Sequence, residues 1–138
     1  MDLIELIELK RLIPAHTPGC LATVDEKNNP DIRGWQFQTI EDGKIYFFTS
    51  ATKNVWKQIQ SNPAVAFFCS ANDYTFRIYG DATHVTDAGL IKRLHSFAAD
   101  GVKALYPTHE SNGFTVFCLE HGKVSYAKGF APFESFEF

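Results

Sequence analysis

The chain has 138 residues, a net charge of −3 at pH 7 and a sequence pI of about 5.9. Hydrophobic residues make up 45% of it and charged residues 21%, which excludes an intrinsically disordered or collagen-like chain. The slight negative charge argues against nucleic acid or an anionic membrane as a partner. We therefore expect one globular domain over residues 1–138.

Hydrophobic periodicity predicts three main helices, taken here in chain order. The first covers 2–13 and the second covers 52–61, and each stops shortly before a proline. The third covers 87–98, with Asp87 as its N-cap, and a short helical piece follows up to Tyr106.

Apolar runs rich in β-branched and aromatic residues predict seven strands, separated by turns of Asn, Asp, Gly and Pro. The first three read as an antiparallel meander and the next two as a hairpin, with Gly80 as a bulge or bend. The last two read as a hairpin across His121–Gly122. The predicted strands cover 20–24, 31–40, 45–50, 64–70, 74–85, 114–120 and 123–128.

These elements indicate a mainly β (α+β) fold, a six- to seven-stranded antiparallel β-barrel with covering helices. The thirteen phenylalanines suit such an interior, because flat rings pack well on a pleated face. Few consecutive strands have the helical crossover that a parallel sheet needs. The motifs GxGxxG and GxxxxGK[ST] are absent, which argues against a Rossmann or P-loop nucleotide site.

Cysteine and histidine spacing argues against a metal site, because the five histidines form no HxH or HxxxH pair. The three cysteines, Cys20, Cys69 and Cys118, stand far apart in apolar runs, and we expect buried, reduced thiols. No apolar run reaches the roughly 18 residues that span a bilayer. The N-terminus is acidic where a signal peptide is basic. We expect a cytoplasmic protein with no metal and no membrane partner.

The region 33–54 carries the groups of a phosphate site. A strand that ends at Ser50 runs into a helix that begins at Thr52, Lys53 and Asn54. Hydroxyls, free N–H groups and a lysine at a helix start are what a phosphate dianion requires. On a neighbouring strand Arg33 offers a forked, permanently charged partner to the same phosphate.

Side-chain alternation divides the strand that contains Arg33 into two faces. Gly34 lets a flat ring approach the backbone closely, and glutamines on its face offer donors and acceptors to a heterocycle edge. One face carries Arg33, Trp35 and Phe37, and the other carries Gly34, Gln36 and Gln38.

The same residues also have an ordinary structural explanation. Serine and threonine before a helix are usually N-caps, and Lys53 is then a solvated charge in the first turn. Trp35 and Trp56 are then core residues. Taken alone, the pattern leaves a phosphate site and a plain helix start both open.

Residues 20–86 resemble the flavin-binding split barrels of the pyridoxamine 5′-phosphate oxidase-like superfamily, and the C-terminal tail looks like that of its small clostridial members. The resemblance implies a split barrel that binds FMN between the two subunits of a homodimer and acts on a small-molecule substrate. The segments that carry it are ATVD (22–25), a turn with Pro30, the strand 32–37, IYFFTS (45–50), a helix from Lys53 to Pro63 and a hairpin from Val65 to Gly80.

Position by position, the resemblance implies that Arg33 and Lys53 contact the phosphate and that the strand around Trp35 faces the isoalloxazine. It assigns no catalytic residue. Together with the helix start, it gives these cofactor-binding candidates: Arg33, Gly34, Trp35, Gln36, Phe48, Thr49, Ser50, Thr52, Lys53, Asn54 and Thr75.

Two departures from the superfamily pattern bear on activity. Oxidation of pyridoxamine phosphate depends there on an arginine-rich C-terminal segment, whereas the last arginine here is Arg93. Nitroimidazole-reductase-like members often carry a histidine where this chain has Phe48. We expect an FMN-dependent oxidoreductase with another small-molecule substrate. The alternatives are a non-catalytic flavin-binding or flavin-storage module and a dimeric barrel that has lost FMN.

Overall fold

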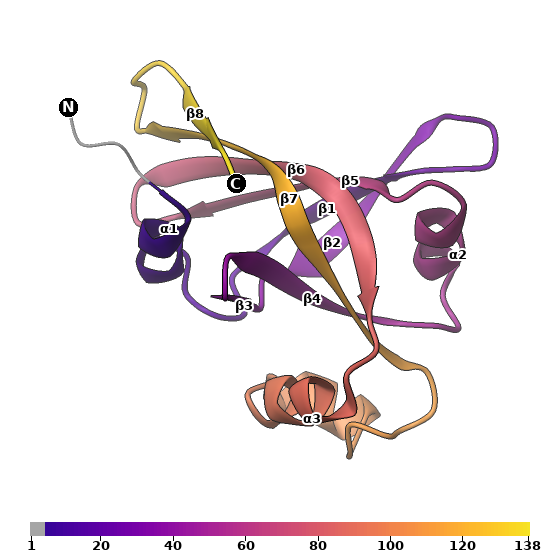
Figure 1. The fold of residues 1–138 in the computed structure, drawn as a ribbon. Helices are drawn as coiled ribbons and strands as arrows, with labels where there is room; N and C mark the ends of the chain where they lie inside the picture. The colour runs from indigo at the N-terminus through magenta and orange to yellow at the C-terminus, as the bar shows by residue number, and fades with distance from the viewer. Residues whose placement is uncertain (1–4) are drawn as a thin grey trace.

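The computed structural model describes residues 5–138, which form one curved sheet with helices around it (Figure 1). The helices in this part of the chain are α1 (Leu6–Leu12), α2 (Asn54–Ser61), α3 (Ala88–Ser96) and α4 (Asp100–Leu105). The strands are β1 (Pro18–Val24), β2 (Pro30–Gln36), β3 (Thr39–Glu41), β4 (Lys44–Ser50), β5 (Ala64–Ala71), β6 (Tyr74–Val85), β7 (Phe114–Lys128) and β8 (Glu134–Glu137).

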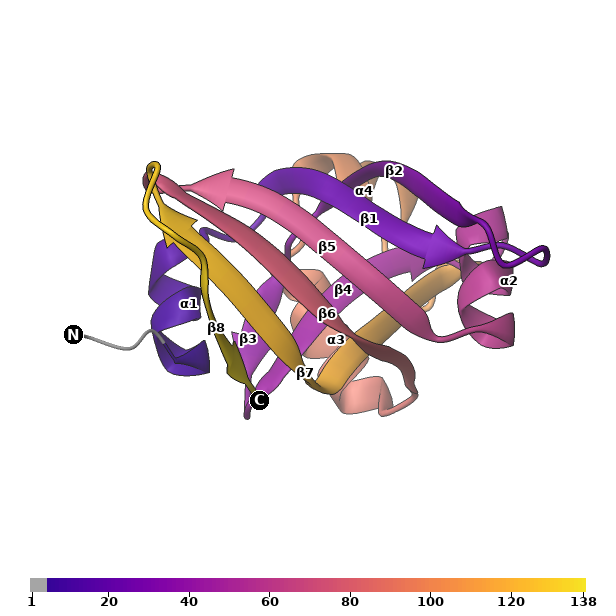
Figure 2. The ribbon, with the colours of Figure 1, turned by 90° about the horizontal axis from the view of Figure 1, so that it is seen from above.

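The sheet has the strand order β2-β1-β5-β6-β7-β4-β3, and β8 pairs with β7. All of these pairs are antiparallel. β2 and β3 stand at the two ends of this order and do not pair, so the sheet curls without closing (Figure 2). α1 and α2 lie at opposite ends of the curled sheet in both views. The expected antiparallel split barrel is confirmed, with eight strands among residues 5–138 in place of six or seven.

The predicted meander over the first three strands is confirmed only in part. β2 pairs with β1, and Thr39 and Ile40, at the end of the predicted strand 31–40, pair with β4 as part of β3. β2 itself does not pair with β4, whose other edge pairs with β7. The strand predicted at 31–40 breaks at Phe37–Gln38, where the chain passes from one end of the sheet to the other. Hydrophobic alternation continues across this break, and for that reason the sequence shows one strand where the structure has two.

The predicted hairpin across His121–Gly122 is also wrong, because 114–128 form the single strand β7. Gly122 lies opposite Gly80 on β6, and a Cβ on Gly122 would come within 2.1 Å of the carbonyl oxygen of Tyr79. Glycine here permits close approach of two strands, where the sequence suggested a turn. The bulge expected at Gly80 is present as a register shift in the same pairing.

Local turn and cap signals are confirmed. β5 and β6 form the expected hairpin, and its turn residues Asn72 and Asp73 both have positive φ, 51° and 67°, as a type I′ turn requires. The Asp87 carboxylate accepts a hydrogen bond from the N–H of Leu90 at 2.8 Å and so caps α3. The start predicted for the first helix, at residues 2–4, lies outside the described residues.

Aromatic rings fill the interior of the curled sheet, which explains the high phenylalanine content. Neighbouring ring centroids lie 5.2 to 6.3 Å apart, the spacing at which ring pairs add to the stabilisation from burial. The fully buried rings are those of Phe37, Phe47, Phe67, Phe76 and Phe117.

Two of the three cysteines are buried, as the sequence predicts. Cys69 and Cys118 are buried, and burial raises the pKa of the Cys69 thiol to about 12. Cys20 is only half-buried, because its side chain lies on the outer face of β1. All three are free thiols.

Candidate functional site

The split between β2 and β4 holds a cavity of about 610 Å³. The C-terminal half of β4 has a free edge here, because β3 pairs only with Lys44–Tyr46. The start of α2 and one residue of α4 complete the walls. The lining residues are Pro18, Gly19, Arg33, Gly34, Trp35, Gln36, Gln38, Phe48, Thr49, Lys53, Asn54, Val55 and Val102.

Most of the sequence-predicted site residues come together in this cavity. Ser50 and Thr52 do not line it. Their hydroxyls lie within hydrogen-bond distance of each other, 2.8 Å, in the turn before α2. Thr75 pairs with Ser70 and Ala127 in the sheet and does not line it either. The predicted residues that do line it are Arg33, Gly34, Trp35, Gln36, Phe48, Thr49, Lys53 and Asn54.

The Arg33 guanidinium is already engaged by protein groups. Its Nη1 donates to Thr23 Oγ1 at 2.7 Å and to the Leu21 carbonyl oxygen at 3.2 Å. Its Nη2 lies 3.0 Å from a carboxylate oxygen of Asp31 and 3.3 Å from Gln58 Oε1. The hydrogen bond from Gln58 and then the charge of Arg33 hold the pKa of Asp31 below its ordinary value. A phosphate would have to compete with Asp31 for this arginine.

The start of α2 is unoccupied by any protein partner. Lys53 is its N-cap residue, and no side chain caps the helix. The exposed Lys53 ammonium forms no hydrogen bond or ion pair with another residue of 5–138. The N–H groups of Asn54 and Val55 have no partner in this part of the chain either. Free N–H groups at the positive end of a helix, beside a lysine, favour an anion.

Two buried polar atoms of the cavity wall also lack partners. The indole Nε1 of Trp35 and the hydroxyl of Thr49 are buried with no hydrogen bond. Thr49 is 6% exposed. A buried polar group left unpaired costs about 1–3 kcal/mol, so native structures normally pair it with a ligand or an ordered water. Trp35 and Thr49 thus place two unpaired polar atoms in the wall of this cavity, beneath its accessible surface.

Nothing in residues 5–138 requires a glycine at position 34. Its φ is not positive, and a Cβ built on it meets no atom within 4 Å. Gly19, which also lines the cavity, differs, since a Cβ there would come within 2.1 Å of the Phe68 carbonyl oxygen. A strand glycine that packing does not need often marks close approach by a ligand or another backbone.

Five lining residues were not among the predicted ones. Gln38 lies two residues beyond the end of β2, and it is buried, 6% exposed. Val102 comes from α4, and no local signal connects it to the cavity. The others are Pro18, Gly19 and Val55.

The lining offers cations, amide groups and aromatic faces, and it contains no histidine, cysteine, methionine, tyrosine or carboxylate. Within residues 5–138, no group of three or more His, Cys, Asp or Glu side chains is placed to hold a metal ion. No helix of the same residues combines the length and apolar character needed to cross a membrane. The cavity can bind an anion beside a flat ring, but it lacks an acid–base pair for chemistry of its own.

The chain matches the family model described as pyridoxamine 5′-phosphate oxidase over residues 6–126. A search of curated proteins gave no match.

Solved structures share the fold. A NimC/NimA family protein from Clostridium acetobutylicum is 22% identical, with a TM-score of 0.81 over 96% of this chain and 93% of that one. A pyridoxamine 5′-phosphate oxidase-related, FMN-binding protein from Nostoc punctiforme is 15% identical, with a TM-score of 0.71 over 88% and 86%. A heme-binding protein from Mycobacterium smegmatis is 16% identical, with a TM-score of 0.75 over 99% of this chain and 59% of that one.

Proposed function

This chain belongs to the pyridoxamine 5′-phosphate oxidase family, and on that basis we propose that it binds FMN in the cavity between β2 and β4 and acts as a flavin-dependent oxidoreductase on a small molecule. The observation that carries the proposal is the uncapped start of α2, with its unpaired Lys53, beside the buried and unpaired Thr49 hydroxyl. The FMN-binding neighbour of the same fold supports it.

The residues of the cavity fit such a group. Lys53 and the N–H groups of Asn54 and Val55 hold the phosphate. The backbone beside Gly34 accepts the ring system. Bound FMN supplies the redox chemistry, while the protein supplies position and electrostatics.

Heme fits this cavity less well. Protein-bound heme iron is held by histidine, cysteine, methionine or tyrosine, and none of these lines the cavity. A helix start with a free lysine suits a phosphate. The heme-binding neighbour therefore supports the fold, and the cavity itself favours the flavin.

We also propose that the protein works as a homodimer. Ile32, Phe68, Tyr79 and Phe133 are large apolar side chains that are 65%, 46%, 37% and 45% exposed. The first three lie on the outward face of β2, β5 and β6, the face that also carries Gly34. An exposed apolar face of this kind marks an interface, and a second copy covering it would also close over the ring of FMN.

The phosphate contact is tested by titrating FMN and riboflavin into the protein and its Lys53→Ala variant. A charge-assisted contact is worth roughly 1.5–3 kcal/mol when it is desolvated, so the variant should bind FMN about ten- to hundredfold more weakly. Riboflavin, which lacks the phosphate, should lose much less. Lys57→Ala is the matched control, because Lys57 is exposed one turn further along the same helix.

Equal losses for FMN and riboflavin would place Lys53 away from the phosphate, and no loss for either would make the start of α2 an ordinary helix start. The purified protein should be yellow, with the flavin absorption bands. Oxidation of NAD(P)H in the presence of an electron acceptor distinguishes an enzyme from a flavin-storage module. Sedimentation at micromolar concentration tests the dimer.

A further inference from the structure

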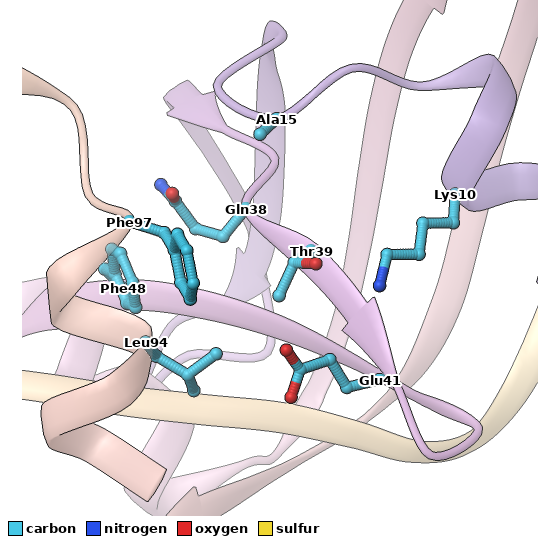
Figure 3. A pocket seen from close by; sticks show the side chains of 8 residues that line it. All are labelled: Lys10, Ala15, Gln38, Thr39, Glu41, Phe48, Leu94 and Phe97. Atoms are coloured by element: carbon cyan, nitrogen blue, oxygen red, sulfur yellow. The ribbon is translucent and has the colours of Figure 1, made fainter.

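A second cavity, of about 240 Å³, lies between α1, the β3–β4 hairpin and α3 (Figure 3). An apolar protein cavity of about 150 Å³ holds benzene, so this one has room for a substituted ring or two fused rings. Its lining residues are Lys10, Ala15, Gln38, Thr39, Glu41, Phe48, Leu94 and Phe97.

Apolar side chains form the body of this cavity. Phe48, Phe97 and Leu94 line it from β4, from the residue after α3 and from α3 (Figure 3). Phe97 is 67% exposed, an uncommon state for a large aromatic side chain on a protein surface. Two rings and a leucine that face an open space favour a flat apolar ligand.

The lining of this cavity contains two charged residues, Lys10 and Glu41, and among residues 5–138 only Glu41 has an ion-pair partner. Lys10, on α1, extends its ammonium toward the cavity and has no hydrogen-bond or ion-pair partner among residues 5–138. The carboxylate of Glu41 is instead neutralised by Arg93, with 2.7 Å between them. Gln38 is buried, and in Figure 3 its amide points away from Lys10. One free cation favours a ligand with a single anionic group.

The two cavities meet at shared walls. Gln38 and Phe48 line both this cavity and the larger one in the split between β2 and β4. The two cavities are therefore adjacent to each other.

We propose that this second cavity binds a small planar apolar molecule with one anionic group and holds it beside the flavin as the substrate. The position beside the flavin rests on the proposed function, whereas binding of the anion rests on Lys10 alone.

The test uses 2-naphthoate and its neutral counterpart 2-naphthamide, titrated calorimetrically into the flavin-loaded protein. Naphthoate should bind about five- to tenfold more tightly than naphthamide, as expected for one partly exposed ionic contact. Lys10→Met should remove that difference. Ala15→Trp fills the cavity from an exposed position and should abolish binding of both probes. Lys92→Met, on an exposed residue of α3 outside the cavity, should change nothing.

The proposal is overturned if neither probe binds, if Lys10→Met keeps the preference for naphthoate, or if Ala15→Trp still binds both. An FMN absorption spectrum that does not change on saturation with naphthoate would overturn the position beside the flavin. Titration of FMN into the same variants distinguishes the anion-binding cavity from the proposed FMN site. A protein that binds naphthoate but not FMN would end the proposed function and leave the anion cavity standing.

Discussion

The starts of α2 and α3 differ in what satisfies their first N–H groups. At α3, the Asp87 carboxylate accepts from the N–H of Leu90, so the chain supplies its own anion. At α2, Ser50 and Thr52 stand close by, but their hydroxyls bond each other and the N-cap position holds Lys53. A lysine at the positive end of a helix is unfavourable for the helix itself.

If α2 binds the phosphate as proposed, this difference separates a helix start that stabilises the fold from one that serves a ligand. α3 needs nothing from outside to satisfy its first turn. α2 gives up about 1 kcal/mol by lacking a cap and presents free donors and a cation to the cavity. On the proposed function, a bound phosphate would offset this cost.

The largest expected effect comes from making α2 resemble α3. Lys53→Asp removes the cation, adds an acid and supplies a cap, so FMN should bind more than about a hundredfold more weakly, while the free energy of unfolding of the flavin-free protein should rise by about 1 kcal/mol. FMN titration and urea unfolding measure the two effects. Lys57→Asp makes the same charge change one turn away and should show neither. A gain in stability with unchanged FMN affinity would refute the phosphate site.

The reverse change removes the cap from α3. Asp87→Ala should lower the free energy of unfolding by about 1 kcal/mol and leave the affinity for FMN unchanged, because α3 starts away from the cavity in the split. Asp87→Asn keeps a capping oxygen and should restore most of the loss. Urea unfolding of the three proteins checks this. A weaker FMN affinity in Asp87→Ala would show that the cap of α3 affects ligand binding at the start of α2.

Arg33 should contribute less to FMN binding than Lys53, because Asp31, Thr23 and Gln58 already hold its guanidinium. Arg33→Ala should weaken FMN by about threefold, less than Lys53→Ala, since an engaged cation gains little from a second partner. Parallel FMN and riboflavin titrations measure the difference. An equal loss in the two variants would show that the phosphate displaces Asp31 from Arg33.

The smallest expected effect is the pH dependence of this engaged cluster. The folded-state pKa of Asp31 lies below its ordinary value of 3.8, so its contribution to stability is present above that pH and is lost as the pH falls through the lower folded value. Asp31→Asn should therefore flatten the acid side of the stability curve slightly. Thermal unfolding between about pH 5 and pH 2.5 checks it. An identical slope would show that the interaction with Gln58 and Arg33 is absent in solution.

Local signals predicted much of this structure. Asn72 and Asp73 set a tight turn through their own backbone conformation, and Asp87 caps the residues that follow it. The candidate site followed from the same kind of signal, because β4 runs directly into α2 and brings Thr49 and Lys53 together.

Contacts between distant segments were not predictable. The pairing of β4 with β7 depends on the curvature of the whole sheet, and the presence of Val102 in the cavity depends on how α4 packs. The engagement of Arg33 depends on Gln58, twenty-five positions later in the chain. Sequence spacing shows which groups are present, but only the fold shows which of them are already paired.

β7 pairs with β4, β6 and β8, and its partners in β4 come more than sixty residues earlier in the chain. During synthesis, β4 therefore leaves the ribosome long before the strand that holds it in place. Long-range pairing of this kind forms late, because the intervening loop must close first. Phe48 and Thr49 should acquire their positions only after β7 has emerged, so on the proposed function a nascent chain should be unable to bind FMN until residues up to Lys128 have left the ribosome.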